Sequence, residues 1–185
     1  IAPPKETLKV WDELNLKRKV VGIGGIDAHA HKYNLVGFLE VEIFPYKVLF
    51  KSIRTHILID EAIKKGKTAK DIETAKWQIY NSLKDGRCFV ANDYVAESKG
   101  FRFYAEFDGV KYQMGDTIPD HKNVTFKVYL PGITAEIKLL RNWHIIETNI
   151  GIDAEFIVNK KGAYRIEVYH EDRAWIYSNH IRVNI

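Results

Sequence analysis

Apolar positions in the first 25 residues predict a helix followed by a buried strand. Leu8, Trp11 and Leu14 recur at helical spacing after two prolines, and prolines just before a periodic stretch are typical of a helix start. Residues 20–23 then form a short, β-branched apolar run that leads into two glycines. A continuous apolar strand after a helix is typical of a parallel sheet buried on both faces. The opening therefore predicts a helix and then a strand of such a sheet.

A second helix is predicted from Pro45. Leu49, Ile53 and Ile57 follow this proline at steps of four residues, which places them on one face of a helix. We expect this helix to end before Gly66.

A third helix is predicted from Thr68. Asp71 stands three residues further on, so the two residues resemble a capping box. An apolar stripe at helical spacing follows over residues 72–83 and ends near Gly86, a residue that suits the position just after a helix.

From residue 87 the apolar period changes to two, which predicts an all-β region. Turn signals such as Asp108-Gly109 separate the strands, and many short strands without a helix favour a sandwich of immunoglobulin-like architecture. Tyr164 is a candidate for the tyrosine corner of such sandwiches. We predict an α+β fold with one part at 1–86 and a β-sandwich at 87–185. The expected strands are Arg87–Ala91, Gly100–Phe107, Val110–Met114, Val124–Leu130, Ala135–Arg141, His144–Thr148, Glu155–Val158, Tyr164–Tyr169, Arg173–Tyr177 and His180–Asn184.

Composition and charge narrow the classes of function. No apolar run approaches the roughly 20 residues that span a bilayer, so we expect a soluble protein without a membrane partner. Cys88 is the only cysteine, which excludes an internal disulfide and favours the cytoplasm. The net charge of +4 arises within 1–86. Its lysine-rich stretch lacks interleaved aromatic residues, so we interpret it as a solvated loop rather than a nucleic-acid surface. These lysines are Lys64, Lys65, Lys67 and Lys70.

The stretch after the predicted strand carries the candidate chemistry. It reads Gly-Gly-Ile-Asp-Ala-His-Ala-His-Lys over residues 24–32. Side chains alternate along a strand, so Asp27, His29 and His31 are expected on one face. Carboxylates and imidazoles bind metal ions, and the glycines leave room for an ion or a phosphate. The alternative is that Asp27 and His29 form a hydrogen-bonded pair at a strand end.

Other side chains nearby are secondary candidates. His31 could be a further ligand or lie at the rim of the site. Lys32 and Arg54 could each neutralise a substrate phosphate. His56 is expected on the second helix beside Arg54, where it would pack on the surface or contact phosphate.

The stretch Gly24–His29 resembles the last motif of the PHP superfamily of metal-dependent phosphoesterases, usually written Gly-Ser-Asp-Ala-His. The similarity continues in short stretches over nearly the whole chain. These stretches resemble the C-terminal portion of PHP proteins that carry an appended sandwich. It implies that 1–86 is the C-terminal segment of a (β/α)₇-type barrel with terminal βα units. It also implies that Asp27 and His29 hold a metal ion. The further matches are Ile43–Tyr46, Phe50, Ile53–Leu58, Gly86–Tyr94, Gly100–Phe103, Met114–Asp116, Gly162–Tyr169 and Trp175–Asn179.

Two departures from the family pattern affect this interpretation. Ile26 replaces a small polar residue, and the early His-x-His, Glu and His ligands of the family belong to upstream strands. The chain begins at Ile1 rather than Met, so we expect an N-terminal barrel segment upstream. Two ligands fall short of the three or four that a catalytic ion requires, and we expect this fragment to be inactive in isolation.

The resemblance implies a parent enzyme that hydrolyses a phosphorylated small molecule with Zn, Mn, Fe or Mg, while this fragment can lack the metal. The alternatives are a β-sandwich that binds or docks a partner, and a structural protein with a degenerate metal site. An unpaired apolar strand at residues 20–23 would also pair with another chain, so we expect either a homo-oligomer through that strand or a strand that is poorly ordered.

Overall fold

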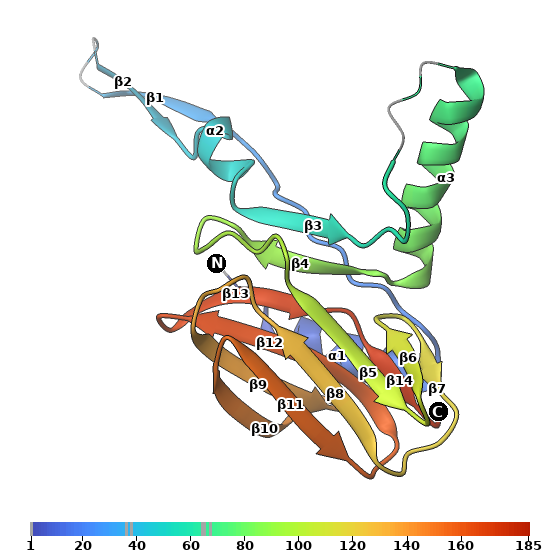
Figure 1. The fold of residues 1–185 in the computed structure, drawn as a ribbon. Helices are drawn as coiled ribbons and strands as arrows, with labels where there is room; N and C mark the ends of the chain where they lie inside the picture. The colour runs from blue at the N-terminus through green and yellow to red at the C-terminus, as the bar shows by residue number, and fades with distance from the viewer. Residues whose placement is uncertain (1, 36, 38, 64–65, 67) are drawn as a thin grey trace.

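The structure, a computed structural model, is mostly β. Its main body consists of two sheets packed face to face (Figure 1). The structure describes residues 2–35, 37, 39–63, 66 and 68–185. The larger sheet has the order β10-β9-β12-β13-β4-β3, with β14 and β7 attached through β12, and the smaller has the order β11-β8-β5-β6. Of the predicted α+β fold, the β-rich part is therefore confirmed, and the described residues form no closed barrel.

All ten strands that period-two patterning predicted after residue 87 are present, with ends that differ by a few residues. The larger sheet contains β3 (Ile53–Ile57), β4 (Cys88–Asn92), β7 (Thr117–Ile118), β9 (Ala135–Arg141), β10 (His144–Gly151), β12 (Gly162–His170), β13 (Arg173–Ser178) and β14 (Ile181–Val183). The smaller sheet contains β5 (Arg102–Phe107), β6 (Val110–Gln113), β8 (Val124–Tyr129) and β11 (Asp153–Val158).

The hydrophobic core lies between these two sheets. Phe103 and Phe126 of the smaller sheet stack at 5.6 Å between ring centroids, and Phe126 meets Tyr164 of the larger sheet at 4.8 Å. All three are at most 1% exposed. The Tyr164 hydroxyl donates to the backbone carbonyl of Lys160, four residues upstream, as a tyrosine corner does.

The outer face of the larger sheet is covered as well. Helix α1 (Lys5–Lys17) lies over β12, and Figure 1 shows it behind the sandwich. Seven consecutive residues of β12, from Gly162 to Val168, are buried. Side chains alternate between the two faces of a strand, so continuous burial requires cover on both faces.

The strand predicted at residues 20–23 is wrong. Residues 18–30 belong to no helix and no strand, and they cross the outer face of the larger sheet. The apolar run has no neighbouring strand among the described residues. Its backbone bonds instead to the side chains of Asn179 and Thr55.

The second predicted helix is also wrong beyond its first turn. Helix α2 covers only Tyr46–Leu49, and β3 pairs antiparallel with β4. Ile53, Thr55 and Ile57 are β-branched, which favours a strand, and pairing with β4 outweighs their helical spacing to Leu49. Arg54 and His56 therefore stand on a strand of the sandwich, not on a helix. This pairing also crosses the predicted division between 1–86 and 87–185.

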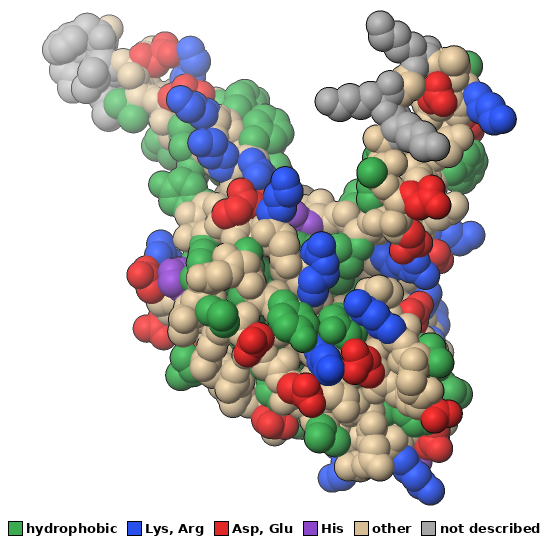
Figure 2. Space-filling view, viewed as in Figure 1, with side chains coloured by type: hydrophobic (Ala, Val, Ile, Leu, Met, Phe, Trp, Pro, Cys, Tyr) green, Lys and Arg blue, Asp and Glu red, His purple; other side chains and the backbone are tan. Residues whose placement is uncertain are grey.

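A hairpin that the sequence pattern did not predict precedes α2. It joins β1 (His31–Leu35) to β2 (Leu39–Ile43) antiparallel, as a separate two-stranded sheet. The hairpin and α2 form an arm, residues 31–35, 37 and 39–50, that projects from the sandwich at the upper left of Figure 1. Figure 2 shows hydrophobic side chains gathered on this arm, and Phe44 and Phe50 are 60% and 57% exposed.

The third predicted helix is confirmed as α3 (Ala69–Asp85). Its capping box is complete, with Thr68 accepting from the Asp71 backbone and the Asp71 carboxylate accepting from the Thr68 backbone. Gly86 ends the helix in the left-handed conformation at φ 80°, which costs glycine little because it has no Cβ. Of the predicted lysine-rich loop, Lys64, Lys65 and Lys67 lie outside the described residues.

Candidate functional site

The segment at residues 18–30 carries the predicted metal pair and is held to the sandwich by side chains. The backbone N–H of Gly22 donates to Asn179 Oδ1 at 2.7 Å, and the Asn179 amide donates back to the Gly22 carbonyl at 2.9 Å. Thr55 Oγ1 accepts from the Gly24 N–H at 2.9 Å and donates to the Gly24 carbonyl at 3.2 Å. One side chain of β3 and one from the loop between β13 and β14 thus take the place of a strand neighbour.

The glycines of this segment allow close packing. A Cβ on Gly22 would lie 2.6 Å from the Trp11 ring, and a Cβ on Gly24 would lie 2.6 Å from Val90 and 2.7 Å from Ile53. Real Cβ atoms do not approach other heavy atoms so closely. Gly22 and Gly24 are therefore required where the segment meets α1 and the sheet. The room predicted beside the glycines for an ion or a phosphate exists only at Gly25, whose Cβ would meet nothing within 4 Å.

The structure brings Asp27 and His29 together at the outer end of this segment. His29 Nε2 lies 3.0 Å from Asp27 Oδ1, and their side chains are 63% and 92% exposed respectively. Exposure alternates from residue 23 to residue 30, so the predicted period of two holds although no sheet forms. Both groups face solvent, as a metal or substrate would require.

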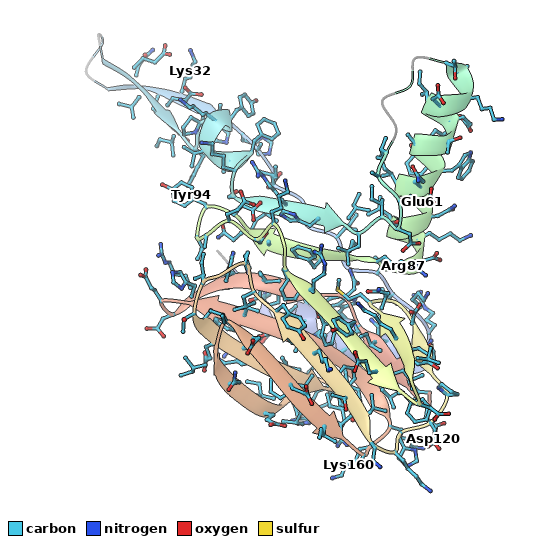
Figure 3. The ribbon with its side chains drawn as sticks, in the orientation of Figure 1. Lys32, Glu61, Arg87, Tyr94, Asp120 and Lys160 are labelled. Carbon is cyan, nitrogen blue, oxygen red and sulfur yellow. The ribbon has the colours of Figure 1, made fainter. Side chains whose placement is uncertain are left out.

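His31 and Lys32 follow at the base of the arm. The His31 ring stacks on His29 with 5.6 Å between centroids, so it could reach a ligand held by His29. Lys32, labelled in Figure 3, bonds to Glu40 across the hairpin at 2.7 Å. This hydrogen bond raises the pKa of Lys32, so its charge already has a partner.

Arg54 and His56 meet at a different place, on the inner face of the larger sheet. Both contact Asp93 Oδ2, Arg54 Nη1 at 3.2 Å and His56 Nε2 at 2.9 Å. Ser98 Oγ donates to Asp93 Oδ1 at 2.5 Å and lies 3.0 Å from the same His56 nitrogen. The Asp93 side chain is only 4% exposed, so Arg54 and His56 serve a nearly buried carboxylate.

This Ser-His-Asp group does not have the arrangement that activates a serine. A catalytic triad needs the hydroxyl and the carboxylate on opposite imidazole nitrogens, whereas Ser98 and Asp93 both contact Nε2 of His56. Ser98 is also completely buried. The group therefore fixes the turn after β4 and offers no nucleophile to solvent.

A further carboxylate–histidine pair lies buried beneath α1, and sequence reasoning missed it. Asp12 accepts from Arg165 at 2.7 and 3.0 Å, and its Oδ1 lies 2.5 Å from His180 Nε2. Arg165 also donates to Glu167 at 2.6 Å. These four side chains, the Asp12 cluster, join α1 to β12 and to the loop before β14. Arg165 and Glu167 occupy the polar positions of an alternating strand, which the pattern assigns to solvent, so the sequence carried no signal for their burial.

Burial and pairing set the protonation of the Asp12 cluster. Burial alone would raise the pKa of Asp12, but hydrogen bonds from His180 and Arg165 outweigh it and lower that pKa. Burial lowers the pKa of His180. The His180 Nδ1 is buried with no hydrogen-bond partner in the described part of the chain, so a proton there would be unsatisfied. The cluster therefore holds an ionised Asp12 and a neutral His180.

A groove of about 600 Å³ lies between α1, residues 20–25 and the outer face of the larger sheet. Leu8 and Trp11 line it from the helix, and Val90 and Tyr177 from the sheet. None of the residues lining it is charged. The groove borders Gly25 but does not include Asp27 or His29, so it is separate from the metal pair.

Comparison of the chain with protein-family models, with curated proteins and with solved structures finds no match. Across the described residues, no three His, Cys, Asp or Glu side chains are grouped so that they could hold a metal ion. None of the helices in the described ranges is both long and apolar enough to cross a membrane. Because the comparisons give no match, a functional assignment rests on the geometry of Asp27 and His29.

Proposed function

We propose that this chain is the C-terminal part of a metal-dependent phosphoesterase of the PHP type, and that Asp27 and His29 hold one of its metal ions. The observation that supports this most is the contact of their side chains, Nε2 to Oδ1 at 3.0 Å, in full reach of solvent. The two side chains are hydrogen-bonded to each other, which was the alternative interpretation of this pair. A histidine and a carboxylate that solvent can reach suit a divalent ion once the ion takes the place of that hydrogen bond. The donor set fits Zn, Mn, Fe or Mg as part of a larger site.

Each side chain has a limited role in this proposal. Asp27 and His29 bind and orient the ion, which when bound lowers the pKa of a coordinated water and neutralises phosphate oxygens. His31, stacked on His29, is not grouped with Asp27 and His29 as a third metal ligand, so its role would be to hold the phosphorylated small-molecule substrate. Lys32 and Arg54 are less suited to phosphate, because Glu40 and Asp93 already pair with them.

On the basis of this family assignment we also propose a more detailed description of the fold. Residues 1–86 would be the C-terminal segment of the barrel, and 87–185 an immunoglobulin-like sandwich. The Tyr164 hydroxyl bond to the Lys160 carbonyl supports the immunoglobulin-like part. The remaining ligands would come from an N-terminal barrel segment.

Metal binding can be tested on this chain by comparing two exposed Asp–His pairs. Asp120 and His121 form the matched control, since His121 Nδ1 lies 3.2 Å from Asp120 Oδ1 and both side chains are partly exposed. We expect added Mn²⁺ to broaden the NMR signals of His29 more than those of His121. Asp27→Asn should abolish the difference, whereas Asp120→Asn should leave it unchanged. Equal broadening of both histidines would contradict the proposal.

Activity requires the intact parent protein. Asp27→Asn there should lower kcat for phosphoester hydrolysis by a factor on the order of 100 or more at saturating Mn²⁺ or Zn²⁺. Loss of a group that only hydrogen-bonds to a metal ligand already costs about 10–100-fold, and loss of a ligand should cost at least as much. Unchanged turnover would exclude Asp27 from the site.

A docking role is a second candidate, and the uncharged groove favours it. A groove of about 600 Å³ without charged residues suits an uncharged, apolar partner. In that case Leu8→Asp should weaken association with the partner, whereas Asp27→Asn should not. A protein with a degenerate metal site would respond to neither substitution.

A further inference from the structure

The segment at residues 20–25 has one satisfied edge and one free edge. The N–H and C=O groups of Gly22 and Gly24 bond to Asn179 and Thr55. The N–H and C=O groups of Val21, Ile23 and Gly25 make no hydrogen bond within the described part of the chain. Alternate peptide groups of an extended chain point to opposite sides, and none of residues 18–26 has a positive φ.

The free edge is complementary to itself. Val21, Ile23 and Gly25 are spaced by two, so an antiparallel copy can place Ile23 opposite Ile23, with Val21 opposite Gly25 on either side. Each such pair exchanges both of its backbone hydrogen bonds. The arrangement has two-fold symmetry, which is the usual symmetry of a homodimer. Ile23 is 68% exposed, and the pairing would remove its apolar surface from water.

The charges that flank the edge favour the same arrangement. Arg18 and Lys19 precede the segment, and Asp27 follows it. Antiparallel pairing brings the basic end of one copy to the acidic end of the other. The bordering groove contains no charged residue, so two identical copies would not repel each other there. A parallel arrangement would place like charges together.

We infer that two copies of this chain associate by antiparallel pairing of residues 21–25, centred on Ile23. The contact is independent of the proposed metal pair, because it uses backbone groups and the side chain of Ile23. An unpaired apolar edge readily recruits another strand, and here the chain itself carries the complementary edge.

A disulfide across the two-fold axis tests the register. Facing residues of a hydrogen-bonded antiparallel pair lie about 5.5 Å apart at Cα, within the range of about 4.4–6.8 Å that a disulfide spans. Ile23→Cys should therefore form a covalent dimer under mild oxidation. Cys88 should not compete, because it is fully buried and burial raises its pKa to about 11.

The matched control is Ile150→Cys on β10, where the side chain is 74% exposed. At micromolar protein, cross-linking of Ile23→Cys should be on the order of 100-fold faster, because the effective concentration inside a pair is in the millimolar range. Equal rates for the two variants would overturn the inference.

Sedimentation of the full chain gives an independent test. The wild type should show a concentration-dependent dimer, and Ile23→Pro should be monomeric, because proline removes the central N–H of the edge. That N–H has no partner within the described residues of one copy, so circular dichroism should show the fold of Ile23→Pro retained. A wild type that is monomeric at all concentrations would overturn the inference. So would a monomer that binds an added extended peptide along residues 21–25.

Discussion

Two of the carboxylate–histidine pairs in the described part of the chain have similar contacts and opposite surroundings. Asp12 and His180 meet at 2.5 Å in the interior, and Asp27 and His29 meet at 3.0 Å in solvent. The side chains of the first pair are 2% exposed or less, and those of the second 63% or more. The distance between a carboxylate and an imidazole therefore does not distinguish a structural pair from a chemically available one.

The number of partners separates the two pairs. Asp12 accepts from Arg165 through both oxygens and contacts His180 as well, so its lone pairs are occupied. Asp27 contacts only His29 among the described side chains. We therefore expect the inner pair to govern stability, and the outer pair to govern ligand binding.

The largest effect is expected from Asp12→Ala. This substitution leaves Arg165 in the interior with Glu167 as its one remaining carboxylate, and breaking a buried ion pair typically costs about 3–5 kcal/mol. The free energy of unfolding, measured by urea denaturation, should fall by about 3 kcal/mol or more. Glu13→Ala is the control, because the Glu13 side chain is 45% exposed and its contact with Lys9 spans 3.9 Å. Similar losses for both variants would contradict the role of the Asp12 cluster.

Gly24→Ala tests how the segment of the outer pair is anchored. The added methyl group would clash with Val90 and Ile53, and overpacking of this kind costs about 1–3 kcal/mol. Gly25→Ala is the matched control, since its Cβ would meet nothing within 4 Å. Thermal unfolding should separate the two variants, and an unchanged melting temperature for Gly24→Ala would show that the close approach is not needed.

The buried pair should also make stability depend on pH. The pKa of His180 is lowered from 6.5, so below pH 6.5 the unfolded chain binds a proton that the folded chain does not. The free energy of unfolding should then fall with falling pH, by up to about 1.4 kcal/mol per unit from this one proton. Asp12, whose pKa is lowered from 3.8, adds a further loss below that pH.

The variant His180→Gln isolates this proton. Its stability, measured by denaturation at several pH values, should change less between pH 6.5 and 5 than that of the wild type. Asp12, Arg165 and Arg182 are the charged groups that act on the His180 ring, and all of them keep their charge in this interval. An identical slope for both proteins would assign the dependence to other groups.

The smallest effect is expected from Asp27→Ala. Asp27 is 92% exposed on its side chain, and exposed pairs contribute little to stability. The melting temperature should stay within measurement error, while the Mn²⁺ effect on His29 should disappear. A clear loss of stability would mean that the outer pair, like the inner one, supports the fold.

The sequence predicted those elements whose local signals agree with their tertiary contacts. Thr68, Asp71 and Gly86 determine α3 locally, and alternating apolar residues predict the strands after residue 87. The helix predicted around Ile53 was wrong because its residues fit two periods. Leu49, Ile53 and Ile57 recur at steps of four, as in a helix, whereas Ile53, Thr55 and Ile57 recur at steps of two, as in a strand. Only the partner strand β4 decides between these periods, and partner strands cannot be deduced from a single segment.

The part of the candidate site that depends on local spacing was predicted, and the part that depends on tertiary contacts was not. The spacing of Asp27 and His29 places them on one side of an extended chain, and the structure has them in contact. The Asp12 cluster could not be predicted, because Asp12 and Arg165 are 153 residues apart in sequence. The anchors Asn179 and Thr55 were missed because a side chain that replaces a strand neighbour has no sequence pattern.

The position of Cys88 makes its alkylation rate a measure of local opening in this protein. The thiol is fully buried, Asn179 donates to its sulfur at 3.2 Å, and it is the only cysteine. An alkylating reagent can reach this sulfur only while the segment at residues 20–25 is separated from β4. The labelling rate under native conditions therefore reports how often that seam opens, without any engineered probe.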